Sequence, residues 1–126
     1  MREFKFRAWS DETKMMYHSH RPNGTNNPMW SYDSVFRANN PKTHIMQYTG
    51  FTDKNGKEIY DGDIAKYMQY KTPIVIIWDW KFAAFDFYHV GDEGARHILS
   101  PRIASESIEV IGNIYENPEL LEEVMT

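Results

Sequence analysis

Two pairs of polar residues have the types and spacing of metal-ligating or proton-transferring groups. His18 and His20 are two residues apart, so on a strand their imidazoles would share a face and could begin a metal site. A third ligand would have to come from far along the chain, from Asp33 or His44. Paired histidines at a strand end are more often solvated, and the chain has no cysteine to support them. We therefore expect no bound metal and no cofactor.

Asp61 and Asp63 form the second pair, on either side of Gly62. Two carboxylates could hold a cation or act as acid and base. The same spacing is what a turn needs, because Asp side chains accept backbone N–H bonds and Gly supplies an unusual φ. We interpret the pair as a turn. The sequence also has no Gly-x-Ser-x-Gly elbow and no phosphate-cradling glycine loop, so an enzyme is not expected.

Aromatic residues crowd one predicted hairpin, and these could form a stacking platform for bases or sugars, or a groove for a Pro-rich peptide. More often such a cluster belongs to a core. Strand alternation favours a core position for Trp78, whereas Trp80 and Phe82 fall at the turn and are candidate binding residues. The aromatic residues of this hairpin are Trp78, Trp80, Phe82, Phe85, Phe87 and Tyr88.

A basic face is the other candidate binding surface. Residues 4–9 alternate apolar and polar at period two, which predicts a half-buried antiparallel strand with Lys5 and Arg7 on its outer face. Lys66 and Lys71 could join them beside an exposed Trp80. However, 18 acidic residues outnumber 14 basic ones and the net charge is −4. Long-range steering therefore opposes a polyanion, and we expect nucleic acid not to be the partner.

Length and composition limit the classes of protein to which this chain can belong. A chain of 126 residues with 41% hydrophobic and 15% aromatic content predicts one domain with a modest core. The absence of cysteine excludes disulfides and thiol catalysis. No apolar run is long enough to span a bilayer, and the first residues have no apolar segment typical of a signal peptide. We expect a cytoplasmic protein that does not act at a membrane.

The stretch 46–64 organises the predicted elements, because it places two turn signals, 53–56 and 61–63, between short apolar runs. Gly112 interrupts the last predicted strand, which indicates a bulge or a close backbone approach. Residues 19–43 are rich in breakers and predict an excursion anchored by Trp30 and Phe36. The predicted strands are 4–9, 15–18, 45–48, 64–70, 74–80, 84–89, 96–99 and 108–115, with one helical turn at 101–105 and a short helix from Asn117 to near Met125.

Four segments of the chain resemble the YopX family of bacteriophage and prophage proteins. They are Lys5-Phe6-Arg7-Ala8-Trp9, then Met46-Gln47-Tyr48-Thr49-Gly50 with Asp53-Lys54-Asn55-Gly56-Lys57-Glu58-Ile59-Tyr60, then Gly62-Asp63-Ile64, and last the run from Val110 to Leu121. They occur in order over nearly the whole chain. The resemblance implies an SH3-like barrel core and a phage or prophage origin. It implies no biochemical activity and transfers no catalytic or binding residue.

The predicted fold is mainly β: a small SH3-like antiparallel barrel with an N-terminal β extension and a short C-terminal helix. One YopX-like domain is expected over 1–126, with the extension and long loop at 1–58, the barrel core at 59–115 and the helix at 116–126. The predicted function is that of a small phage-encoded binding protein without catalysis, whose partner is an unknown protein or a second copy of the chain. A nucleic-acid-binding small barrel is the alternative.

Overall fold

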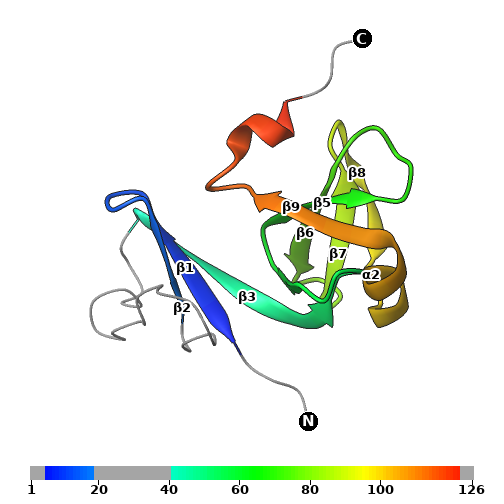
Figure 1. The fold of residues 1–126 in the computed structure, drawn as a ribbon, viewed down its shortest axis with the longest axis horizontal. Coiled ribbons are helices and arrows are strands. Elements are labelled where there is room, and N and C mark those ends of the chain that lie inside the picture. Colours follow the sequence, from blue (N-terminus) through cyan, green and yellow to red (C-terminus); the bar gives the residue numbers. More distant parts are fainter. Residues whose placement is uncertain (1–4, 19–40, 123–126) are drawn as a thin grey trace. The chain divides into compact units, whose positions relative to one another are not determined.

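Three antiparallel strands occupy the first part of the chain: β1 (Phe6–Ser10), β2 (Met15–His18) and β3 (Thr43–Thr52) (Figure 1). The computed structural model describes residues 5–18 and 41–122. The predicted excursion at 19–43 therefore lies almost wholly outside the described residues, as do Trp30, Phe36, His20 and Asp33. β1 pairs with β2 on one side and with β3 on the other. Arg7, Ala8 and Trp9 are all buried, where the sequence predicted alternation, so side chains on both faces of this strand are covered.

The chain separates into two compact units, residues 1–48 and 49–126. The boundary falls inside β3, earlier in the chain than the predicted start of the barrel core at Ile59. The last part of β3 continues in the second unit, where β4 (Glu58–Tyr60) is its hydrogen-bonded neighbour. The turn between them is the predicted one, with Gly56 at a φ of 81°.

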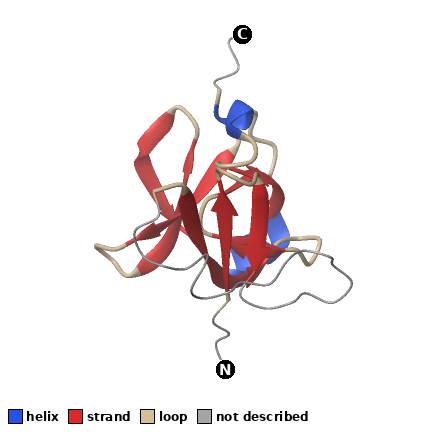
Figure 2. Ribbon diagram, turned by 90° about the vertical axis from the view of Figure 1, so that its left-hand side faces the viewer, coloured by secondary structure: helices blue, strands red, loops and turns tan. Residues whose placement is uncertain are grey.

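Five antiparallel strands in the order β8-β7-β6-β5-β9 form the half-barrel of the second unit (Figures 1 and 2). The mainly-β prediction is confirmed. The strands are β5 (Asp63–Tyr67), β6 (Ile74–Asp79), β7 (Ala84–His89), β8 (Asp92–Ile98) and β9 (Ile108–Asn113), with helix α2 (Pro101–Ser107) between β8 and β9.

Both faces of the central strand β6 are buried at its start, as its length and β-branched composition predicted. Ile74 and Ile76 join one apolar cluster with Phe87 and Leu99, whereas Val75 joins another with Ile64 and Val90. Successive side chains of a strand point to opposite faces, so the two clusters lie on opposite sides of the sheet.

Asp53 closes the β9 edge of this sheet. Its buried carboxylate accepts N–H bonds from Asn55 and Lys57 through Oδ1, both at 2.9 Å, and from Val110 through Oδ2 at 2.9 Å. The Lys54 N–H donates to the carbonyl of Ile108 at 2.9 Å. The 53–56 turn thus satisfies outward-facing backbone groups of β9 as well as its own.

Gly112 lies at the predicted irregularity. The β5–β9 register shifts between Ile64 and Ala65, opposite Gly112, and a Cβ at residue 112 would lie 2.8 Å from the amide carbon of Asn117. Only glycine at residue 112 leaves room for the Asn117 side chain, whose Oδ1 accepts the Asn113 N–H at 3.1 Å. The predicted C-terminal helix is shorter than expected: a 3₁₀ turn, η1 (Pro118–Leu121), which Asn117 precedes without a side-chain cap.

Candidate binding site

The connection between β6 and β7 carries two highly exposed aromatic rings. The end of β6 extends beyond the apolar core, so Trp78 is 39% exposed. Beyond the end of the strand, Trp80 and Phe82 are 77% and 76% exposed. The prediction of a core position for Trp78 is wrong: its ring packs edge-on against Phe85, with centroids 4.8 Å apart, but its outer face reaches solvent. We call residues 78–82 the aromatic tip.

Asp79 fixes the turn that presents these rings. Asp79 pairs with Ala84 at the end of the β6–β7 ladder, and its Oδ1 accepts the Lys81 N–H at 3.0 Å. Ala83 has a φ of 50°, which a residue with a Cβ adopts at a cost and which often marks functional turns. Two large apolar rings are thus held out in solvent by a structured turn.

An open pocket of about 370 Å³ lies against the aromatic tip. Its charged groups are one carboxylate, Asp79, and two cations, Lys81 and Arg96. The Lys81 ammonium lies 6.0 Å from the centre of the Trp80 ring, and the Arg96 guanidinium lies 5.0 Å from that of Tyr88. The pocket is lined by Ile77, Trp78, Asp79, Trp80, Lys81, Phe82 and Arg96.

A buried carboxyl group, Asp86, lies on the strand beside the tip and was missed by sequence reasoning. Burial, a hydrogen bond with Asp79 and the charge of Asp79 raise the pKa of Asp86, which the charge of Arg96 only partly opposes. Burial also acts to raise the pKa of Asp79, but hydrogen bonds from Asp86 and from the Lys81 and Phe82 N–H groups outweigh it and lower that pKa. The sequence signal was a lone charge inside the apolar run Ala84–His89.

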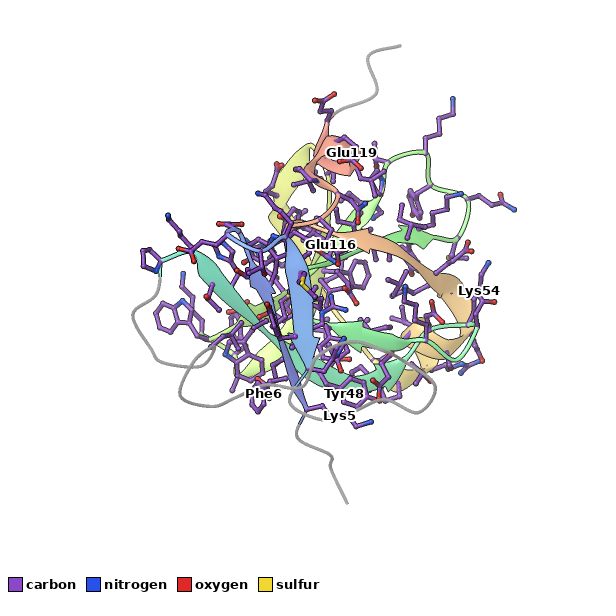
Figure 3. All side chains as sticks on the ribbon, turned by 60° about the vertical axis from the view of Figure 1, so that its left-hand side comes forward. Lys5, Phe6, Tyr48, Lys54, Glu116 and Glu119 are labelled. Carbon is purple, nitrogen blue, oxygen red and sulfur yellow. The ribbon has the colours of Figure 1, made fainter. Side chains whose placement is uncertain are left out.

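Lys5 and Arg7 do not form the predicted open basic face. Arg7 is only 8% exposed, and an Nη of its guanidinium lies 3.5 Å from Sδ of Met46, so the expectation that it lies on a solvent-facing strand surface is wrong. The Lys5 ammonium lies 5.4 Å from the centre of the Tyr48 ring (Figure 3). Lys66 and Lys71 belong to the second unit.

A second pocket, of about 660 Å³, lies beside the turn that follows β5. Met68 and Tyr70 are exposed there, and Met68 has a φ of 53°. The pocket has two lysines and two glutamates, so its charges balance. Nζ of Lys54, which is labelled in Figure 3, lies 3.8 Å from Oε1 of Glu109. The pocket is lined by Lys54, Lys66, Met68, Gln69, Tyr70, Glu106, Ser107 and Glu109.

Neither of the polar pairs first considered forms a site in the part of the chain that the structure describes. Asp63 is buried and accepts the Tyr60 N–H at 2.7 Å, while Gly62 has a φ of 92°, so this pair serves a turn. Among residues 5–18 and 41–122, no three His, Asp or Glu side chains gather to hold a metal ion. His20 lies outside these residues, so the absence of a metal stays a prediction.

Comparison with known proteins settles the family. Residues 5–122 match the family described as YopX protein. The chain belongs to the YopX family. A crystal structure of protein EF1440 from Enterococcus faecalis is 29% identical, with a TM-score of 0.66, over 97% of this chain and 100% of that one.

A second solved structure, protein yopX from Bacillus subtilis, is similar in fold. It is 23% identical, with a TM-score of 0.55, over 94% of this chain and 98% of that one. No match is found among curated proteins. In the described part of the YopX chain, no helix has the length and apolar character needed to cross a membrane.

Proposed function

We propose that this YopX chain is a small binding protein without catalysis, and that the aromatic tip contacts a partner protein. The observation that supports this is the exposure of Trp80 and Phe82 on a turn fixed by Asp79. Folding gains little from rings that remain in solvent, and exposed aromatic clusters are typical of interaction surfaces. The pocket beside the tip has one carboxylate and two cations, but the net charge of the whole chain is −4, so a partner protein is favoured over a polyanion.

Paired substitutions test this proposal. The variant Trp80→Ala with Phe82→Ala removes the tip rings, and Met68→Ala with Tyr70→Ala is the matched control, because it removes two other exposed apolar side chains of the same unit. Affinity capture from the host cell should recover a protein with the parent and the control but not with the tip variant. Recovery of the same proteins by all three would overturn the assignment of the tip.

Self-association through the tip is tested with the same variants. Sedimentation at rising concentration should show a mass increase for the parent and the control that the tip variant lacks, if the partner is a second copy of the chain. If the tip variant associates as the parent does, the second copy docks elsewhere.

A single-stranded nucleic acid is the second candidate partner, and one observation favours it: Lys81 and Arg96 stand beside the tip rings. Base–aromatic stacking contributes about 1–3 kcal/mol per base, and phosphate contacts make affinity fall with salt at a slope of about −0.7 each. The net charge of −4 opposes such binding.

Fluorescence anisotropy with a labelled single strand separates the two partners. We expect no binding at physiological salt. Micromolar binding that is lost in both Trp80→Ala and Lys81→Glu would replace the proposed protein partner by a nucleic acid.

We infer, further, that the chain is encoded by a phage or prophage and acts in the host cytoplasm. Membership of the YopX family supports the origin, and the location follows from it, because a phage-encoded binding protein meets host proteins inside the cell. Fractionation of infected or lysogenic cells, with an antibody against the chain, tests the location.

A further inference from the structure

Asp86 has one oxygen that the described part of the protein leaves without a donor. The residue is 4% exposed, and its Oδ1 is buried with no hydrogen-bond partner. A buried polar atom without a partner is unfavourable, and more so when it is charged. A proton on the carboxyl group removes the buried charge, and the other oxygen can donate that proton to a neighbouring acceptor.

The β6–β7 register supplies that acceptor. Asp86 lies opposite Ile77, and Asp79 lies opposite Ala84. Asp79 and Asp86 are therefore diagonal neighbours on the same face of an antiparallel pair, a distance that side chains can bridge. Asp79 already accepts the Lys81 N–H with Oδ1, and its carboxylate has further lone pairs to receive a proton from Asp86.

We propose that Asp86 is a positioning residue for the aromatic tip: as a neutral carboxylic acid it donates a hydrogen bond to Asp79, and Asp79 holds the turn that presents Trp80 and Phe82. This inference rests on the proposed function of the tip. Asp86 is itself buried and is absent from the pocket lining, so it acts through Asp79 and not by touching the partner.

The charges that face Asp86 make this arrangement sensitive to pH. They are Asp79 on β6 and Arg96 on β8. When Asp86 loses its proton, two carboxylates face each other at close range and the donor to Asp79 disappears. Arg96 offsets part of the repulsion, but its Nε is engaged with the Glu93 carbonyl at 2.8 Å. Deprotonation therefore loosens Asp79 and the turn that it holds.

Carboxyl ¹³C NMR of the full chain tests the proton directly. In the parent, Asp86 should titrate above the ordinary value of 3.8, and in Asp79→Asn its midpoint should fall, because the charge of its neighbour is gone. A parent midpoint at or below the ordinary value would overturn the proposal. This measurement on the parent needs no variant and does not depend on any partner.

The indole N–H resonance of Trp80, assigned with Trp80→Phe, reports the conformation of the aromatic tip. It should shift in the parent over the same pH range as the Asp86 carboxyl. In Asp86→Asn, whose amide donates at every pH, the shift should be lost, and in the control Asp92→Asn it should persist. A shift that is unchanged in Asp86→Asn would mean that Asp86 has only a structural role.

Partner binding gives the last readout and separates the two proposals. If the tip binds a protein, capture by the parent should weaken as pH rises through the Asp86 titration, while capture by Asp86→Asn should stay constant. If capture never depends on Trp80 and Phe82, the proposed function fails, yet the NMR titrations still decide whether Asp86 positions the turn.

Discussion

Gly62 has a φ of 92°, and this angle explains why Asp61-Gly62-Asp63 is a turn and not a carboxylate site. The Gly62 N–H donates to the Ile76 carbonyl at 2.7 Å, and the Ile114 N–H donates to the Gly62 carbonyl at 2.9 Å. One residue thus connects the start of β5 to β6 and to the end of β9, in a conformation that a side chain strongly disfavours.

Replacing Gly62 by Val should destabilise the protein by about 1–3 kcal/mol, because a β-branched residue at positive φ is strained. Gly94→Val is the matched control, since Gly94 has no atom within 4 Å of a built Cβ. Urea unfolding of both variants checks the difference. Equal losses would show that the backbone angle at residue 62 is not what matters.

Three aromatic rings of the β6–β7 hairpin, Trp78, Trp80 and Phe87, should differ in the stability lost when each is truncated. Trp78→Ala should lose about 1–2 kcal/mol, because only one face of its ring packs, whereas a buried ring such as Phe87 should lose about 3–5. Trp80→Ala should change stability by no more than about 0.5 kcal/mol. Urea denaturation of the three variants gives the order of the losses in stability. A loss for Trp78→Ala as large as that for Phe87→Ala would contradict the prediction.

At the scale of elements, sequence periodicity located most of the strands, but it missed β4, predicted less than half of β3 and extended β5 past its end at Tyr67. It also could not predict what each strand packs against. Strands 84–89 and 15–18 have the predicted bounds, because turn residues delimit them locally. β1 alternates in sequence, yet Arg7 is buried, with its guanidinium against Sδ of Met46 on β3. β8 begins earlier than predicted, at Asp92, because an irregular pairing with β7 extends it through Gly94.

Asp53 shows most clearly that a residue predicted to serve only its own turn can also bind a distant strand. The sequence placed it in a turn, but its Oδ2 reaches Val110, which is 57 residues away. Nothing in the spacing of a turn indicates which distant N–H its carboxylate will accept. For the same reason the sequence could not connect Asp86 with the tip, because the register of β6 and β7 is what places it beside Asp79.

Replacing Asp53 by Ala should cost at least about 2 kcal/mol, because three backbone N–H groups lose their acceptor. Asp92→Ala is the control, since Asp92 is exposed. Thermal melts compare the two, and amide hydrogen exchange at Val110 should accelerate in Asp53→Ala. Unchanged protection at Val110 would contradict the proposed tie between the 53–56 turn and β9.

At the scale of the whole molecule, stability should respond to pH through groups of opposite sign. Tyr67, His89 and His97 have ring contacts with Phe87. The ring centroids of His89 and His97 are 5.8 Å apart, and those of Tyr70 and His89 are 4.7 Å apart. Burial and the charge of His97 lower the pKa of His89, which Asp92 partly opposes. The raised pKa of Asp86 acts in the other direction.

The sign for each group follows from which state binds more protons. His89 takes up a proton near 6.5 in the unfolded chain but resists it when folded. Its contribution to stability is therefore present above pH 6.5 and is lost as pH falls through its lower folded value. The contribution of Asp86 is present below pH 3.8 and is lost as pH rises through its raised folded value.

His89→Gln should therefore flatten the loss of stability that the parent shows as pH falls from 7.5 to 5. His97→Gln should reduce that loss without abolishing it, because it removes only the neighbouring charge and leaves the burial of His89. Thermal melts of the three proteins across this range check the prediction. If His89→Gln loses as much stability on acidification as the parent, the acid sensitivity arises elsewhere in the molecule.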